Sequence, residues 1–377
     1  MNGSITKRGK HSWRIAVDLG RDENGKRQRR FETVNGTKAE AQRKLRELVS
    51  TVENGLPVDT TKATVGEFMQ QWLLDYAETN TCARTVEGYT GNIRRYITPK
   101  LGSIPLAKLT PQQIQSLYAY MLKKGLSPQT ILHTHRVLRE ALSHAVKWGL
   151  IIRNACDAVD PPKPRRTQVK TLDAASIQKL FKATSRSPYG AVFYIALYTG
   201  MRRGEILGLR WHDINLQNKA ISVNQTVTKL AGKALTINDP KTPYSRRLVS
   251  LPPSAAAMLS GLKIKRMEQL EMAGIAWDEF AFVFCNADGG PLSPDTVSHA
   301  FPKALTKAGL PHIRFHDLRH THATLMLKQG VHPKIVSERL GHASINITLD
   351  TYSHVMPGMQ ENAALIFEES LKTANSI

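Results

Sequence analysis

This sequence contains few cysteines and no long apolar run. Its three cysteines, Cys82, Cys156 and Cys285, lie far apart and form no CxxC pair, so they indicate neither a disulfide framework nor a zinc site. No segment is long and apolar enough to span a bilayer, and the opening residues MNGSITKRGKHSW lack the apolar core of a signal peptide. We therefore expect a protein that stays in a reducing cytoplasm.

Acidic residues are scarce beside basic ones. Asp and Glu total 31 against 52 Lys and Arg, which gives a formal net charge of +21. The excess recurs along the whole chain, so a polyanionic partner such as DNA or RNA explains it better than a basic solvated surface does. With 377 residues and 41% apolar content, the chain is long enough for two or three domains, each with its own core.

Residues 1–60 predict a small basic β-sheet followed by one helix. The segments SITKRG, SWRIAVDLG and KRQRRFETV have the pattern of short strands, with apolar residues alternating from Trp13 to Val17. The next segment begins with a capping box of Thr37 and Glu40, which predicts a helix packed against the sheet. Four arginines are left to contact DNA phosphates or base edges, or to form only a charged solvent face: Arg14, Arg27, Arg29 and Arg30.

Residues 64–155 predict an all-helical domain. A second capping box, Thr64 and Glu67, opens the segment, and Phe68, Trp72 and Tyr76 share one helical face, which indicates a core stripe. Two further helices begin with Thr or Ser followed by Pro and end at Gly, in TPQQIQSLYAYMLKKG and SPQTILHTHRVLREALSHAVKWG. The basic residues that line a DNA-facing surface, or are merely solvated, are Arg84, Arg94, Arg95, Lys123, Lys124, Arg136 and Arg139.

Residues 156–170 predict a linker, because DPPKPRRTQVK is rich in proline and basic residues and lacks periodicity. Residues 171–377 predict a third domain, with helices over DAASIQKLFKAT and GAVFYIALYTG and a short antiparallel sheet from KAISVNQTV to SRRLVSLP. The fold class is therefore multidomain and mainly α with small β-sheets. After Tyr352 the tail predicts a short amphipathic helix with the apolar residues Ala363, Ala364, Ile366, Phe367 and Leu371.

Four clusters in the third domain carry chemistry: YTGMRRGEILGLRW, DPKTPYSRR, FHDLRHTHATLML and RLGHASINITLDTYSHV. Each alone has a structural explanation, such as a surface arginine, a turn lysine, a helix cap or a packed aromatic ring. Together they supply what metal-free DNA strand exchange needs. A tyrosine can attack phosphorus reversibly, guanidinium groups stabilise the phosphate charge, a lysine protonates the leaving oxygen, and imidazoles bind the phosphate or move the nucleophile's proton.

These clusters resemble the motifs of tyrosine recombinases of the phage-integrase family. TGMRRGEILGLRW resembles the family's first arginine box, PKTPYSRR its β-hairpin lysine segment, HDLRHTHAT its His-x-x-Arg box, and LGH followed by TYSH its last box. The resemblance implies an enzyme that breaks and rejoins DNA through a 3′-phosphotyrosyl intermediate, with no metal, cofactor or ATP. The catalytic residues that it implies are Arg202, Lys241, His316, Arg319, His342 and the nucleophile Tyr352, with Glu205 supporting Arg202.

The resemblance extends to the other domains. Residues 64–155 resemble the family's helical, SAM-like core-binding domain in pattern and position, and residues 1–60 resemble the arm-binding domain of prophage and conjugative-transposon integrases. Dimer-resolving relatives lack that arm-binding domain. The resemblance therefore implies integration and excision of a mobile element, such as a viral genome, in a bacterial cell. It implies double-stranded DNA with core-type and arm-type sites, a tetramer on synapsed DNA, and a DNA-bending host factor and an excisionase as optional partners.

Three other interpretations stay open at the level of sequence. His316, His320, His322 and His342 offer a metal site, although no acidic cluster accompanies them. A non-enzymatic DNA-binding regulator explains the charge but gives the paired arginine boxes no role. A type IB topoisomerase resembles the family in its catalytic chemistry but not in the arm-like domain.

Overall fold

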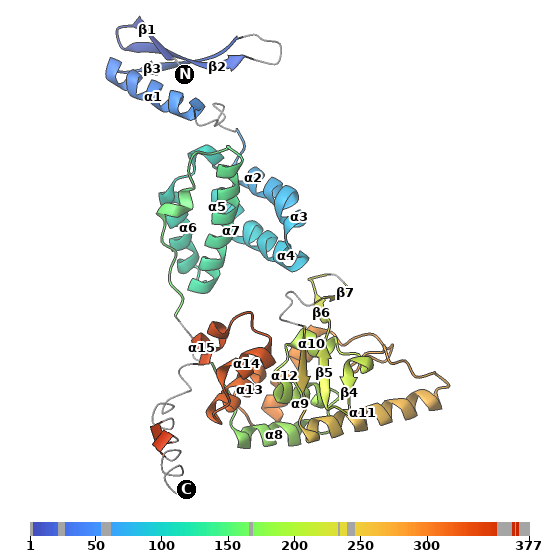
Figure 1. The fold of residues 1–377 in the computed structure, drawn as a ribbon. Helices are drawn as coiled ribbons and strands as arrows, with labels where there is room; N and C mark the ends of the chain where they lie inside the picture. The colour runs from blue at the N-terminus through green and yellow to red at the C-terminus, as the bar shows by residue number, and fades with distance from the viewer. Residues whose placement is uncertain are drawn as a thin grey trace. The chain divides into compact units, whose positions relative to one another are not determined.

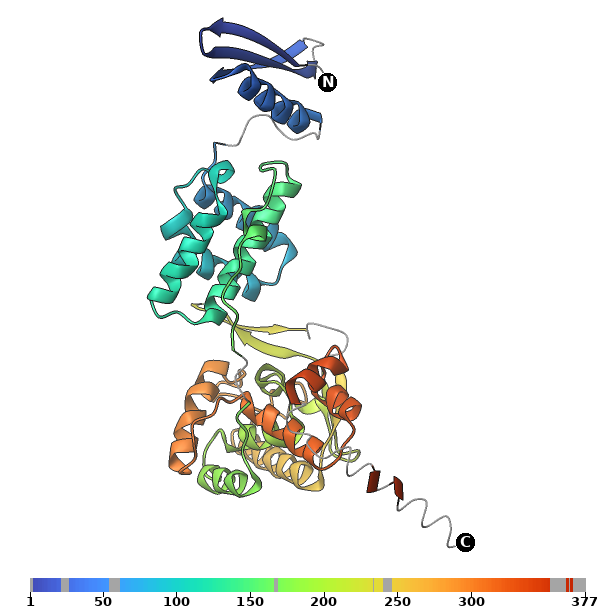
Figure 2. The same ribbon diagram turned by 90° about the vertical axis from the view of Figure 1, so that its left-hand side faces the viewer.

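The computed structural model describes residues 3–21, 27–53, 62–165, 169–232, 234–239, 246–352, 364–365 and 367–368. The chain forms two compact units, Met1–Arg166 and Thr167–Ile377, and each is described by itself. Figures 1 and 2 show the ribbon from two sides. None of the helices within the described ranges combines the length and apolarity that crossing a membrane requires.

The first unit begins with a three-stranded antiparallel sheet and a helix. Its elements are β1 (Gly3–Gly9), β2 (Ser12–Arg21), β3 (Arg27–Asn35) and α1 (Lys38–Glu53), with the strand order β1-β2-β3. Helix α1 lies against one face of the sheet (Figure 1), where Ile15 and Val17 are buried together with Ala41. The predicted capping box is present, because the backbone N–H of Thr37 donates to Glu40 Oε2 at 2.7 Å. The opposite face of the sheet remains open.

The rest of the first unit is helical. Its elements are α2 (Val65–Trp72), the π-helical turn η1 (Leu73–Ala77), α3 (Glu78–Asn80), α4 (Ala83–Asn92), the π-helical turn η2 (Ile93–Ile97), α5 (Thr98–Leu101), the 3-10 turn η3 (Leu106–Lys108), α6 (Pro111–Lys123), α7 (Pro128–Lys147) and the 3-10 turn η4 (Ala155–Ala158). Reciprocal capping boxes begin α2 at Thr64 and α6 at Thr110, and Ser127 caps α7. The helix N-termini that were predicted from Thr, Ser and Pro are thus confirmed.

Trp72 is the centre of the helical core. Its ring is fully buried, its indole Nε1 donates to His144 Nδ1 at 3.2 Å, and it stacks on Tyr76. Phe68, on the same face of α2, is buried as well. The aromatic stripe predicted from sequence is therefore core. It joins the N-terminal helices of this domain to α7, which carries His144.

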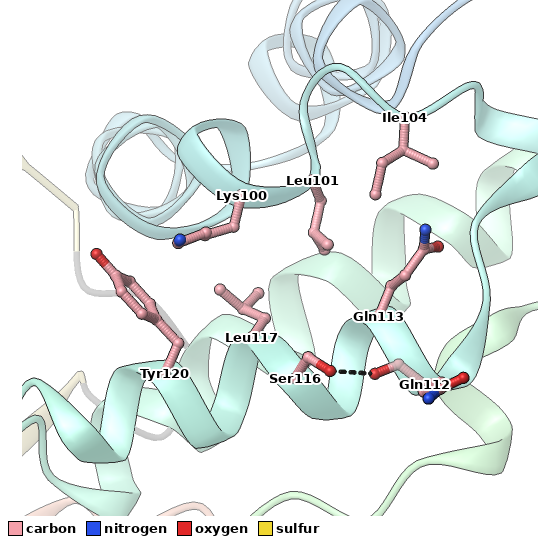
Figure 3. Close-up of a pocket in the computed structure, with 8 residues that line it drawn as sticks. All are labelled: Lys100, Leu101, Ile104, Gln112, Gln113, Ser116, Leu117 and Tyr120. Atoms are coloured by element: carbon pink, nitrogen blue, oxygen red, sulfur yellow. Dashed lines mark hydrogen bonds between the residues drawn. The ribbon is translucent and has the colours of Figure 1, made fainter.

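Figure 3 shows a pocket of about 460 Å³ in the helical part of the first unit. It is lined by α5 and the residues after it, and by the exposed side of α6: Lys100, Leu101, Ile104, Gln112, Gln113, Ser116, Leu117 and Tyr120. The Ser116 hydroxyl donates to the carbonyl of Gln112, and Lys100 Nζ lies 4.1 Å from the centre of the Tyr120 ring. Amides and aliphatic groups make up most of the lining.

The segment expected to be a linker begins with ordered structure. Cys156, in η4, is buried in the helical core, and Arg139 pairs with Asp157 at 2.8 Å. Residues 155–158 thus pack on the helical domain. The domain limits 1–60, 64–155, 156–170 and 171–377 remain proposals.

The second unit contains α8 (Ala174–Thr184), α9 (Gly190–Thr199), α10 (Arg203–Leu207), η5 (Trp211–Asp213), β4 (Ile214–Asn215), β5 (Ala220–Val223), β6 (Thr226–Lys229), β7 (Leu235–Asn238), β8 (Arg247–Ser250), α11 (Pro253–Met272), α12 (Pro294–Lys307), α13 (Asp317–Lys328), α14 (Pro333–Leu340) and α15 (Ile345–Tyr352). Strands β4, β5 and β8 form the predicted antiparallel sheet, whereas β6 and β7 form a separate two-stranded ribbon. Helix α9 is apolar nearly all round and lies in the core, in contact with α10, α11 and α13. These contacts place α10 and α13 against the same helix, α9, and α14 contacts both α13 and β8.

We predict that Trp72→Ala destabilises the helical domain by about 3–5 kcal/mol, because it leaves a large cavity and removes the hydrogen bond to His144. Hydrogen exchange resolved by mass spectrometry suits a chain with several domains, and it should show faster exchange in the α2 and α7 peptides. Trp148→Ala is the control, because Trp148 is 42% exposed in the same aromatic cluster. Equal decreases in protection in the two variants would contradict the central role of Trp72.

Candidate active site

Arg202 is fixed at the connection between α9 and α10. Helix α9 ends at Gly200 in the left-handed conformation (φ 66°), and Arg202 is the N-cap residue of α10. The backbone N–H of Arg202 donates to Glu205 Oε2 at 2.9 Å, and its Nη1 donates to Glu205 Oε1 at 2.8 Å. Its Nη2 donates to the carbonyl of Gly341 at 3.0 Å. The side chain remains 40% exposed, so the guanidinium can still meet a ligand.

A second arginine, Arg247, forms another ion pair with Glu205. Its Nη2 lies 2.9 Å from Glu205 Oε2, and its Nε donates to the carbonyl of Arg339 at 2.7 Å. Sequence reasoning did not assign Arg247 a role. The sequence feature that could have pointed to Arg247 is its place as the second arginine of PKTPYSRR, at the start of strand β8.

Glu205 is buried and ionised. Burial alone raises the pKa of its carboxyl, but the hydrogen bond and charge of Arg247, together with those of Arg202, outweigh burial and hold the pKa below its ordinary value. Ionised Glu205 therefore stabilises the fold above the ordinary carboxyl pKa. This contribution disappears as the pH falls through the lowered pKa.

Arg319 approaches the same connection from α13. It is buried, and its Nη1 donates to the carbonyl of Gly200 at 2.8 Å. Burial and the neighbouring charge of Arg202 lower the pKa of Arg319 to about 9, which leaves it protonated at neutral pH. Arg319 is thus bound to the connection that carries Arg202, 117 positions away in the numbering.

The histidines divide into separate environments. Burial lowers the pKa of His316 and of His342 to about 4, so both imidazoles are neutral at pH 7. His342 Nδ1 is hydrogen-bonded to Thr348 Oγ1 at 2.8 Å, whereas His322 Nε2 accepts from Arg339 Nε at 3.0 Å. Among the described residues, no three His, Cys, Asp or Glu side chains gather as metal ligands would.

Tyr352 lies at the end of α15 with its ring buried. The ring is 1% exposed and packs with the apolar residues of α13 and α14: Ala323, Leu327, Val336 and Leu340. Its hydroxyl is hydrogen-bonded to His320 Nδ1 at 2.7 Å. Burial raises the pKa of Tyr352 to about 12. Sequence reasoning considered His320 only as a metal ligand, although HDLRHTH places it one helical turn beyond His316.

The remaining predicted site residues belong to the first unit or lie outside the described residues. Lys241 lies outside the described residues, as do Ala363, Ile366 and Leu371 of the tail and the side chains of Arg27 and Arg30. Arg14 lies over the exposed Phe31 ring at 4.1 Å on the open face of the N-terminal sheet, and Arg29 is exposed. In the helical domain Arg94, Arg95 and Arg136 are exposed, and Arg139 is engaged by Asp157.

Gly200 offers a test of how tightly the connection is packed. A Cβ there would lie 2.6 Å from His322 Cδ2 and 2.7 Å from Leu340 Cδ2, whereas one at Gly309, which has nearly the same φ, would meet no atom within 4 Å. Both alanine variants are destabilised by about 1–2 kcal/mol through the left-handed backbone, and Gly200→Ala by about 1–3 kcal/mol more through overpacking. Hydrogen exchange in α9, α10 and α13 measures the difference. Equal exchange in the two variants would contradict the close packing.

Comparisons with known proteins identify the family of this chain. Residues 170–358 match the phage integrase family, and residues 64–122 match the N-terminal SAM-like domain of phage integrases. A protein named tyrosine recombinase XerC-like, from Caldanaerobacter subterraneus subsp. tengcongensis, is 33% identical over 96% of this chain and 96% of its own.

Two solved structures share the fold. The Tn1549 transposon integrase in complex with transposon right end DNA has a TM-score of 0.69 at 23% identity, covering 81% of this chain and 99% of that one. A lambda integrase tetramer bound to a Holliday junction has a TM-score of 0.57 at 20% identity, covering 90% of this chain and 95% of that one. From the match over its C-terminal half and the identity along its whole length, the chain belongs to the phage integrase family of tyrosine recombinases.

Proposed function

We propose that this tyrosine recombinase integrates and excises a mobile element by cutting and rejoining DNA with Tyr352 as the nucleophile. The observation that carries the proposal is the meeting, within one unit, of Arg202, Arg319 and the hydroxyl of Tyr352 from three separate segments. Family membership supplies the reaction class, a site-specific breakage and rejoining of DNA strands. The roles of the individual residues are our assignment.

The arginines provide the electrostatic part of the mechanism. As the tyrosine oxygen attacks phosphorus, charge grows on the non-bridging oxygens, and the planar forks of Arg202 and Arg319 stabilise it. Each such contact lowers the barrier by about 2–4 kcal/mol. Glu205 holds the Arg202 fork in place by accepting a hydrogen bond from Nη1, and it also accepts one from the Arg202 backbone N–H. Arg319 is also oriented by the protein, through its hydrogen bond to the Gly200 carbonyl.

The remaining groups bind the phosphate and move protons. His316 and His342 are neutral at pH 7, so each can donate one hydrogen bond to a phosphate oxygen. In the tautomer where His342 Nδ1 accepts a hydrogen bond from the Thr348 hydroxyl, the ring proton is on Nε2 and can be donated to the phosphate. Lys241 would protonate the departing 5′-oxygen, as the family resemblance implies. The tyrosyl ester keeps the energy of the broken bond, so rejoining needs no ATP.

We further propose a tetramer on synapsed DNA. A lambda integrase with the same fold is a tetramer on a Holliday junction, and a strand exchange between two duplexes needs four cuts. The helical domain would hold core-type sites, and residues 1–60 would hold arm-type sites. A bending host factor and an excisionase fit this arrangement, and DNA in the cytoplasm is the proposed place of action.

Two alternatives are weaker. A non-enzymatic regulator has no use for a tyrosine hydroxyl held beside an imidazole, or for a buried arginine bound to the connection that carries a second one. A type IB topoisomerase would share the chemistry, but the comparisons place this chain among recombinases and integrases.

Tyr352→Phe should abolish covalent attachment to a duplex that carries the core site, because the variant lacks the nucleophilic oxygen. The affinity of the variant for the duplex should stay within about twofold of the wild-type affinity, since the phosphate contacts remain. Gel separation under denaturing conditions measures the yield of the covalent adduct, and fluorescence anisotropy measures the affinity for the duplex. Tyr189→Phe, at a partly buried tyrosine packed against the main core of the same unit, is the control. An adduct of wild-type yield in the Tyr352→Phe variant would place the nucleophile elsewhere.

Deleting residues 1–60 should leave cleavage at the core site intact but impair recombination that requires distal arm sites. The plot of log affinity against log salt should also become less steep, by about 0.9 for each DNA phosphate that these residues neutralise. Anisotropy titrations on duplexes with and without the arm site measure the change in slope. A recombination assay with full-length attachment sites measures the dependence on the arm sites. Normal recombination by the truncated chain would refute the arm-binding role.

A further inference from the structure

We infer that His320 is the general base that accepts the proton of Tyr352 during DNA cleavage. This rests on the proposed function, in which Tyr352 is the nucleophile. A general base must lie within hydrogen-bond reach of the proton that it takes, and His320 Nδ1 is 2.7 Å from the tyrosine oxygen. Both groups are built into the fold. His320 lies on α13, and Tyr352 is anchored by the apolar cluster of α13 and α14.

Nearby imidazoles are engaged otherwise in the described part of the chain. His316 faces His320 edge to face, with their ring centres 5.0 Å apart. His342 is bound through Nδ1 to Thr348, and His322 to Arg339. The Tyr352 hydroxyl forms its hydrogen bond with His320. Geometry therefore selects His320 from four candidates.

The protonation states of the pair suit this role. Burial lowers the pKa of His320, with a smaller opposing effect from Asp317, and burial raises the pKa of Tyr352 to about 12. At pH 7 the pair is thus a neutral imidazole beside a neutral phenol. With Nδ1 as the acceptor, the ring proton resides on Nε2. The base is already in its reactive form, while the nucleophile is the group that needs activation.

The step balances as a single displacement. The tyrosine oxygen forms a bond to phosphorus as the bond from phosphorus to the 5′-oxygen breaks, and the phenolic proton passes to His320 Nδ1. The leaving 5′-oxygen takes a separate proton from Lys241, in its proposed role. In rejoining, the 5′-hydroxyl attacks phosphorus and returns its proton to neutral Lys241, the bond from phosphorus to the tyrosine oxygen breaks, and the imidazolium of His320 gives its proton to that departing oxygen. Transfer accompanies bond formation, because a free phenolate beside an imidazolium is disfavoured here.

The first measurement is single-turnover cleavage at saturating protein. We expect His320→Ala to slow adduct formation by about 10²–10⁴-fold with little change in DNA affinity. His320→Asn keeps a hydrogen-bonding group near the Nδ1 position but cannot accept the proton, so it should be similarly slow. Wild-type cleavage by either folded variant would overturn the inference. Circular dichroism and hydrogen exchange of α13 establish whether each variant is folded. If His320→Ala does not fold, His320→Asn carries the test.

A fluorinated tyrosine at position 352 separates proton acceptance from positioning. Fluorine makes the phenol more acidic, so a general base becomes less necessary. We expect the rate ratio between wild type and His320→Asn to shrink at least about tenfold when the fluorinated residue replaces Tyr352. An unchanged ratio would mean that His320 only orients the ring, and this outcome would overturn the inference.

The two proposals fail in different ways. If Tyr352→Phe still forms the adduct, the nucleophile assignment fails, and the role of His320 fails with it. If Tyr352→Phe is inactive while both His320 variants cleave normally, the proposed function stands and only the base assignment is refuted.

Discussion

The buried carboxylate of Glu205 is the constraint on which the site depends. A carboxylate out of water is tolerated only when it is paired and hydrogen-bonded, and here two guanidinium groups satisfy both oxygens. Arg202 also binds the carbonyl of Gly341, and Arg247 binds that of Arg339. One ion-paired centre therefore ties together the start of α10, strand β8 and the end of α14. The fork of Arg202 is oriented by bonds that exist before any DNA arrives.

Tyr352, the proposed nucleophile, is held mainly by apolar packing. Apolar packing anchors the ring of Tyr352, and one hydrogen bond to His320 satisfies its hydroxyl. The same burial keeps the nearby imidazoles neutral and strengthens electrostatic interactions, because water does not screen them. Charged arginines, neutral histidines and a protonated phenol thus coexist in one site. This division of protonation states is what general acid–base chemistry at neutral pH requires.

Local chemistry made much of this structure predictable from the sequence. Capping boxes at Thr37 and Thr64, alternation in the N-terminal strands and the stripe around Trp72 are short-range signals, and each is present. The family motifs pointed to Arg202, Glu205 and Arg319, whose network the structure displays. Sequence did not show that β6 and β7 form their own ribbon. Nor did it show the contact of Arg247 with Glu205, 42 residues away, or that of His320 with Tyr352, 32 residues away. No local pattern specifies contacts between segments so far apart in the sequence.

The most direct test of the account is to identify the atom that becomes bonded to DNA. The full-length protein would be trapped on a nicked core-site duplex, digested with protease and nuclease, and sequenced by tandem mass spectrometry. The account predicts a nucleotide joined through its 3′-phosphate to Tyr352, in the peptide that includes SINITLDTYSHV. A nucleotide on any other residue, or one attached through a 5′-phosphate, would contradict it.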